Sequence, residues 1–164
     1  MCAIVQPDID ITSENLLETF LSKDIRLGTS TPGADPSGDY AWKLFERADH
    51  LKPGSFDILS RKALLLTGGP TSQKPPKDRN AYGWVMGENK ADIFLTYCSN
   101  AVSAAMDTPG IQVVSIPAEL SVVANYGLLE RKGAPENAWR LALYILSPAG
   151  QKILGKYGFE PVAN

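Results

Sequence analysis

Short apolar runs alternate along this chain with longer segments whose apolar residues recur every three or four positions. Residues 64–67 and 91–98 are typical of buried strands, and residues 80–88 between them have a helical pattern. Strands that alternate with helices predict an α/β fold with mostly parallel strands. In such sheets, ligands bind at the carboxyl ends of the strands.

The same patterns predict the remaining elements. In chain order, these are a strand at 3–5, a helix at 14–22, a strand at 25–29, a helix from Asp39 that ends at 52–54, a helix at 56–63, a short helix at 100–106, a strand at 111–116 and two helices within 135–157. Residues 30–38 and 68–77 are rich in Gly, Pro and hydroxyl side chains, which favours loops. Residues 121–129 are apolar and β-branched, which predicts either a long strand or a crossing between two lobes.

Composition excludes several classes of protein. The 164 residues are 44% hydrophobic, and 16 basic against 18 acidic side chains give a net charge of −2. The apolar fraction is typical of a globular chain, and the charge balance provides no general attraction to nucleic acid. Because the sequence has no run of 18 apolar residues, no segment is expected to be inserted in a membrane.

The start of the chain lacks the basic region and the long apolar stretch of a secretory signal peptide. Two interpretations follow: a cytoplasmic chain, or a fragment whose first part is missing. The strand-like residues 3–5, with no leader or cap before them, favour the fragment.

Cys2 and Cys98 are too few for a disulfide scaffold and have no metal-binding spacing. A single bridge between them is one interpretation if the chain is exported. Two buried free thiols are the favoured interpretation, because free cysteine is among the most buried residue types.

Three places offer donors or charges that suit an anion. Residues 30–38 lead from a strand end to a helix start, where Ser37 and the amides of Ser37, Gly38 and Asp39 are candidate donors at the positive end of the helix dipole. An ordinary capped turn is the alternative there, since the carboxylates of Asp35 and Asp39 compete for the same amides.

Arg79 lies at the next helix start and suits an anionic group, although a solvated charged turn is the alternative. Tyr97 emerges at the carboxyl end of the most apolar strand, where its phenol suits either a cleft or packing. His50 is the only histidine, and no nucleophile has a base beside it, so the sequence predicts no enzyme, no metal site and no cofactor.

Three segments are similar to motifs of a known family. Residues 35–41 (DPSGDYA) resemble V-P-A-G-x-Y-A, residues 89–101 (NKADIFLTYCSNA) resemble G-E-A-D-x-G-I-V-Y-x-S-D-A, and residues 142–159 (ALYILSPAGQKILGKYGF) resemble F-x-x-F-L-x-S-P-E-A-Q-x-I-x-x-x-Y-G-F. These are motifs of the periplasmic molybdate-binding proteins, the type II solute receptors of molybdate ABC transporters. The last motif also occurs in other type II receptors.

The resemblance implies a type II periplasmic-binding-protein-like α/β fold, with one nearly complete lobe and part of the other around a cleft. Residues 9–117 would form the second lobe, and residues 1–8 and 118–164 would be the remnant of the first lobe with the hinge crossings. The family's opening segment has no counterpart here, which again favours a truncated chain. A surface that should pack against the missing lobe predicts a homodimer.

For function, the resemblance implies a periplasmic receptor that binds molybdate or tungstate and delivers it to an ABC permease. Ser37, with Gly38 beside it, matches a position whose backbone amide binds the oxyanion, and Tyr97 matches a tyrosine that donates its hydroxyl. Arg79 stands where the family has an apolar residue with a ligand-binding amide. Because Arg79 and the 68–77 insertion depart from the family, the alternative is a receptor or effector-sensing domain for a different anionic small molecule, with Arg79 as a ligand contact.

Overall fold

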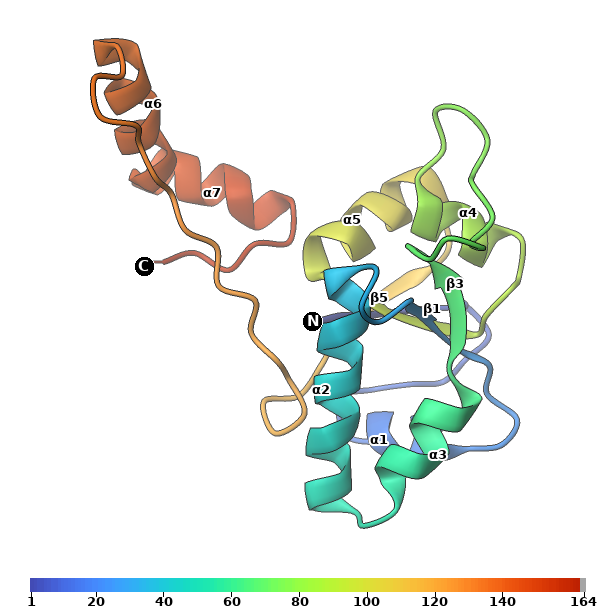
Figure 1. Cartoon of the computed structure of the whole chain (residues 1–164). Coiled ribbons are helices and arrows are strands. Elements are labelled where there is room, and N and C mark those ends of the chain that lie inside the picture. Colours follow the sequence, from blue (N-terminus) through green and yellow to red (C-terminus); the bar gives the residue numbers. More distant parts are fainter. Residues whose placement is uncertain (163–164) are drawn as a thin grey trace. The chain divides into compact units, whose positions relative to one another are not determined.

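A computed structural model describes residues 1–162, and the chain divides into two units, Met1–Val123 and Ala124–Asn164. The first unit contains, in chain order, β1 (Cys2–Val5), α1 (Leu16–Leu21), β2 (Leu27–Ser30), α2 (Pro36–Leu51), α3 (Ser55–Lys62), β3 (Leu64–Thr67), α4 (Ala81–Gly87), β4 (Ile93–Thr96), α5 (Cys98–Asp107) and β5 (Gln112–Ser115). The second unit contains α6 (Glu136–Leu146) and α7 (Pro148–Lys156) (Figure 1). The assignment of these residues to the lobes of a larger receptor stays a prediction.

The five strands form one sheet in the order β3-β2-β4-β1-β5. The α/β class is confirmed, but the expectation of mostly parallel strands is wrong. β2 runs parallel to β3 and β4, whereas β1 runs antiparallel to both of its neighbours, β4 and β5. Apolar patterns show where strands are but not their direction, so the inserted β1 was not foreseeable. The carboxyl ends of β2, β3 and β4 still share one edge.

Helices cover both faces of this sheet (Figure 1). Alternate residues of β1 point to opposite faces: Ala3 and Val5 pack with residues of α1, α2 and α3, whereas Cys2 and Ile4 pack with residues of α4 and α5. Phe45 on the first side and Phe94 on the second are fully buried. The sheet is therefore the middle of three layers, and its strand ends are left for other contacts.

Cys2 and Cys98 form a disulfide bond, so the prediction of two free buried thiols is wrong. Cys2 lies opposite Thr96 in the ladder between β1 and β4, and α5 begins with Cys98 just after β4. The two Cα atoms are 4.8 Å apart, within the range for a disulfide. This pairing depends on the insertion of β1 beside β4, across 96 residues of sequence.

Two helices begin earlier than predicted. α2 starts at Pro36 rather than Asp39, because Asp35 caps it and proline suits the first helical position. α5 starts at Cys98 rather than Asn100. Residues 121–129 form no strand; Val122 is buried in the core of the first unit, and the chain leaves that unit after Val123.

The second unit has the two predicted helices, separated at Ser147, whose hydroxyl accepts a hydrogen bond from the Gly150 amide at 3.2 Å and so caps α7. The ring of Tyr126 meets that of Phe159 edge-on at 5.3 Å. Several large apolar side chains of α6 are exposed, namely Trp139, Leu141, Leu143, Tyr144 and Leu146. Their coverage by a second copy of the chain stays a prediction. Within residues 1–162, no helix has the length and apolar character needed to cross a bilayer.

Arg26 and Asp92 tie the start of β2 to the start of β4. The Arg26 amide and guanidinium both donate to the Asp92 carboxylate, with Nε at 3.1 Å from Oδ1, and the guanidinium also binds Asn89. The pKa of Asp92 lies below its ordinary value of 3.8, chiefly because Arg26 donates side-chain hydrogen bonds to it. The carboxylate is mostly shielded from solvent, at 15% exposure, so this pair matters more than a surface pair.

A lowered pKa in the folded state means that Asp92 stabilises the fold fully above about pH 4 and loses this contribution as the pH falls through its folded pKa. Asp92→Asn is therefore expected to lower the free energy of unfolding by about 1 kcal/mol at pH 7 and to flatten its decline in acid. Urea unfolding at pH 7 and at pH 3 measures both effects. Parallel pH profiles of the two proteins would refute this role.

Candidate functional site

Each of the three parallel strands ends in a hydroxyl side chain. Ser30 ends β2, Thr67 ends β3 and Thr96 ends β4; Ser30 and Thr96 are fully buried and Thr67 nearly so. Ser30 Oγ lies 2.8 Å from Thr67 Oγ1. Because the carboxyl ends of parallel strands meet at one edge, this edge of the sheet carries a row of neutral hydrogen-bonding groups.

The first turn of α2 packs against this edge. The Ser37 amide donates to the Asp35 carboxylate at 2.9 Å, and the Gly38 amide donates to the Asp35 carbonyl at 2.9 Å. The amides that were candidate anion donors are therefore engaged within the helix cap. The Ser37 hydroxyl is fully buried and lies 3.2 Å from Thr96 Oγ1, so Ser37 joins α2 to the end of β4.

Gly38 permits this close approach. A Cβ atom on Gly38 would lie 2.6 Å from the Ser30 carbonyl oxygen and 2.7 Å from the Pro32 nitrogen, closer than real Cβ contacts allow. Any side chain at this position would push the first turn of α2 away from the backbone of residues 30–32. The sequence identified Gly38 through its amide, whereas the structure shows a role in packing.

The start of α5 differs from that of α2. Tyr97 occupies the N-cap position, and no side chain caps the helix from it; α2, α4 and α7 are capped by Asp35, Asn80 and Ser147 respectively. Asn100, in the first turn, donates from Nδ2 to Thr96 Oγ1 at 3.0 Å. The half-buried Tyr97 ring meets the Tyr40 ring edge-on at 5.6 Å. The first-turn amides of α5 therefore lie at the positive end of the helix dipole, among hydroxyl groups.

Arg79 lies away from this edge, beside the last residue of α5. Its Nε lies 3.1 Å and 3.0 Å from the two oxygens of Asp107, and its guanidinium also donates to the Thr108 hydroxyl at 3.3 Å. The pKa of Asp107 is lowered, chiefly by these hydrogen bonds from Arg79. Asp107 ends α5, a helix of 10 residues and about 15 Å, so Arg79 lies near the opposite end of that helix from Tyr97. The structure thus brings Ser37, Gly38 and Tyr97 to one edge and places Arg79 away from it.

Sequence reasoning missed Thr96 and Asn100, which connect the starts of α2 and α5 through Ser37. A hydroxyl at the last position of an apolar strand, followed four residues later by an amide, was the available signal. The part of the chain that the structure describes contains no group of three His, Cys, Asp or Glu residues that is arranged to hold a metal ion.

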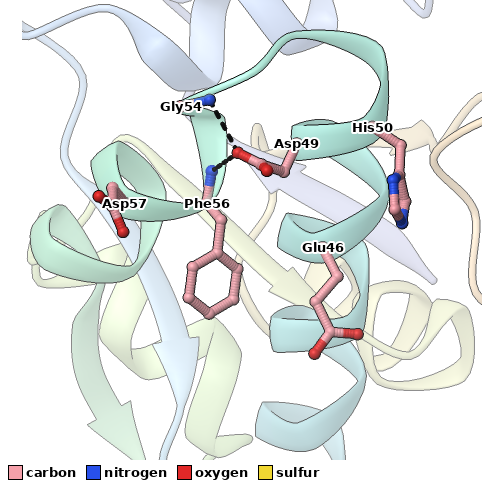
Figure 2. Close-up of a pocket in the computed structure, with 6 residues that line it drawn as sticks. All are labelled: Glu46, Asp49, His50, Gly54, Phe56 and Asp57. Carbon is pink, nitrogen blue, oxygen red and sulfur yellow. Dashed lines mark hydrogen bonds between the residues drawn. The ribbon is translucent and has the colours of Figure 1, made fainter.

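A surface pocket lies near the other end of α2, at the turn into α3 (Figure 2). Its lining residues are Glu46, Asp49, His50, Gly54, Phe56 and Asp57. The Asp49 carboxylate accepts hydrogen bonds from the amides of Gly54 and Phe56, at 2.9 and 3.1 Å, and so holds the turn. Three carboxylates in one pocket repel an anion. The 16-residue α2 spans about 24 Å, which separates this pocket from the carboxyl edge.

Residues 1–160 match the model of a family described as bacterial extracellular solute-binding protein. The chain is 38% identical over 164 residues to an uncharacterized protein of Pasteurella multocida, in a match that covers 98% of this chain and 66% of that protein.

Two solved structures are similar in fold. The structure of PEB3 with L-phospholactate bound has a TM-score of 0.70 at 15% identity and covers 97% of this chain and 64% of that one; PEB3 comes from Campylobacter jejuni. A substrate binding domain from Clostridium difficile, assigned to a molybdenum ABC transporter, has a TM-score of 0.59 at 18% identity and covers 98% of this chain and 62% of that one. At such identities the likeness shows the fold alone. The chain spans slightly less than two thirds of the length of these relatives.

Proposed function

Because the chain belongs to the bacterial extracellular solute-binding protein family, we propose that it binds a small solute that carries a tetrahedral oxyanion, as the receptor of an ABC importer. The group is either a free oxyanion, molybdate or tungstate, or the phosphate of a small organic acid. The motif resemblance and the fold of the C. difficile domain support the first source. The fold of PEB3, whose structure holds L-phospholactate, supports the second.

The observation that carries this proposal is the start of α5. The helix begins directly after β4, at the edge where three strands end. Tyr97 occupies its N-cap position, and no side chain caps the helix. Backbone amides at such a helix start, with hydroxyl groups around them, bind an anion without a formal positive charge. An internal cap at this position would have made the same amides unavailable, as it does at α2.

Neutral donors suit a receptor that must also release its ligand. In a desolvated site, neutral donors hold an oxyanion firmly only if every oxygen of the anion accepts a hydrogen bond. The size and shape of the ligand therefore decide the affinity. Arg79, which would add a full charge, is paired with Asp107 instead. We therefore propose binding without catalysis, in the periplasm, with an ABC permease as the partner that accepts the solute.

A panel of anions tests this function. Molybdate, tungstate, sulfate, phosphate and L-phospholactate are added to this chain, and to any longer form that its gene encodes, in a thermal unfolding assay. A ligand at 100 times its dissociation constant is expected to stabilise the protein by about 2.7 kcal/mol and to raise Tm by roughly 5 to 10 °C. Response to molybdate and tungstate alone identifies the free oxyanion, and response to L-phospholactate alone identifies the phosphorylated acid.

Tyr97→Phe is the matched variant for this panel, since it removes one hydroxyl and keeps the ring beside Tyr40. It is expected to weaken binding of the responding anion about 10-fold, the value of one hydrogen bond to a charged group. If none of the five anions stabilises any form of the protein, the proposed function is wrong.

A further inference from the structure

The buried hydroxyl groups of Ser37 and Thr96, at the carboxyl edge, carry two protons, but only one of these protons has a hydrogen-bond acceptor. Ser37 Oγ and Thr96 Oγ1 bond to each other at 3.2 Å, and Thr96 Oγ1 also receives Asn100 Nδ2 at 3.0 Å. Within residues 1–162, neither hydroxyl makes another hydrogen bond, and both side chains are fully buried. Each hydroxyl carries one proton, whereas the amide nitrogen of Asn100 only donates. One hydroxyl proton therefore has no acceptor.

The spare proton belongs to Ser37 if the three groups form a directed chain. A hydroxyl that accepts a hydrogen bond becomes a better donor, so donation from Asn100 to Thr96 favours donation from Thr96 to Ser37. The opposite direction would leave Thr96 accepting two bonds and donating none. Ser37 also lies in the first turn of α2, where the helix dipole favours an anion.

The backbone amide of Ser37 cannot serve the same purpose in this arrangement, because the Asp35 carboxylate occupies it at 2.9 Å. The hydroxyl is thus the donor that Ser37 retains. A buried donor without an acceptor costs free energy, and a bound oxyanion that accepts the proton removes this cost. Burial also strengthens the hydrogen bond, because little water competes for the acceptor.

We propose that the Ser37 hydroxyl, rather than its amide, donates to an oxygen of the bound anion, and that Thr96 and Asn100 position this hydroxyl. The inference rests on the proposed function and deepens it, because it names the donor atom and the chemistry of its acceptor. That acceptor is an unprotonated oxygen, as on an oxyanion.

The same three residues distinguish this chain from the motifs that it resembles. Ser37 stands where V-P-A-G-x-Y-A has alanine, and Thr96 and Asn100 stand where G-E-A-D-x-G-I-V-Y-x-S-D-A has valine and aspartate. With alanine and valine at these positions, neither hydroxyl would exist. The directed chain is therefore a feature of this sequence rather than of the motif.

Ser37→Ala, Thr96→Val and the double variant test the directed chain of hydrogen bonds, with the responding anion of the five-member panel as the probe. Ser37→Ala is expected to weaken binding about 10- to 100-fold, because it removes a hydrogen bond to a charged group. Thr96→Val, which leaves the Ser37 hydroxyl in place but unoriented, is expected to weaken binding a few-fold. The double variant should bind about as weakly as Ser37→Ala, because both changes affect one hydrogen bond.

Thr29→Val is the matched control. Thr29 is also fully buried, and its hydroxyl has no hydrogen-bond partner among the described residues, so it makes no hydrogen bond to Ser37, Thr96 or Asn100. Its loss is expected to leave anion binding unchanged.

Asn100→Asp reverses the direction of the hydrogen bonds, because a carboxylate accepts where the amide donates. Thr96 would then donate to residue 100 and Ser37 to Thr96, so that no proton is left for the anion. Asn100→Asp is expected to weaken binding at least 10-fold, whereas Asn100→Ala, which consumes no proton, stays within a few-fold of the wild type. In the Ser37→Ala background, Asn100→Asp should weaken anion binding by a smaller factor than it does in the wild type. This difference separates the loss of the Ser37 proton from simple repulsion between the new carboxylate and the anion.

The outcomes separate two failures. If an anion binds the wild type and Ser37→Ala equally well, the hydroxyl has only a structural role and this inference is wrong, while the proposed function stands. If Ser37→Ala and Thr96→Val weaken binding additively, the two residues act independently and the directed chain is wrong. If no anion of the panel binds the wild type, the inference falls together with the proposed function.

Discussion

Removal of the Cys2–Cys98 disulfide is expected to lower the free energy of unfolding by about 4 kcal/mol, because the bond closes a loop across 96 residues. Such a crosslink restricts the unfolded chain far more than the folded one. The bond also fixes Cys98, the first residue of α5, to β1, which lies between β4 and β5 in the sheet. Its loss should therefore loosen the start of α5 and weaken anion binding as well as stability.

Urea unfolding of the wild type with and without dithiothreitol, beside the Cys2→Ala/Cys98→Ala variant, measures this effect. The reductant should lower the midpoint for the wild type to about that of the variant, and it should leave the variant unchanged. Equal midpoints for the oxidised wild type and the variant would show that the bond contributes nothing to stability.

Gly38→Ala is expected to cost about 2 kcal/mol of folding free energy, as overpacking against a rigid neighbour does. The added Cβ would meet the Ser30 carbonyl oxygen at 2.6 Å and the backbone of residues 31 and 32 at 2.7 Å. Backbone cannot swing aside like the end of a side chain, so the first turn of α2 must shift. Because that turn carries Ser37, anion binding should weaken together with stability.

Gly155→Ala provides the matched control, since Gly155 is also helical and has open space where a Cβ would lie. Replacing it should stabilise α7 by about 0.5 to 1 kcal/mol, because alanine is the better helix former. Thermal unfolding of both variants compares the two cases. Equal changes in Tm would mean that Gly38 makes no close approach to the 30–32 backbone.

The order of strands and helices was predictable because apolar periodicity is local. Residues 91–98 read as a buried strand followed by a helix, and the structure has β4 and α5 there. Contacts distant in sequence were not predictable. The direction of β1 depends on its insertion between β4 and β5, and the disulfide follows from that insertion. Nothing near Cys2 or Cys98 in the sequence indicates either feature.

The candidate site shows the same division. A helix start after the 30–38 loop drew attention to Ser37 and Gly38, and the competition of Asp35 for the Ser37 amide follows from local chain geometry. Thr96 was not identified, because its local signal does not reveal its contact with Ser37, which lies 59 residues away in the sequence. The partner of Arg79 was equally hidden, since Asp107 lies 28 residues further along the chain.

The central claim is that a tetrahedral oxyanion binds at the carboxyl edge of the sheet, between the starts of α2 and α5. Titration of the 15N-labelled protein with the anion that stabilises it most, followed by amide chemical shifts, tests this claim most directly. Saturable shifts largest at residues 37–41 and 97–101 are the predicted result. Shifts centred on residues 46–57, around the acidic pocket of Figure 2, would contradict it.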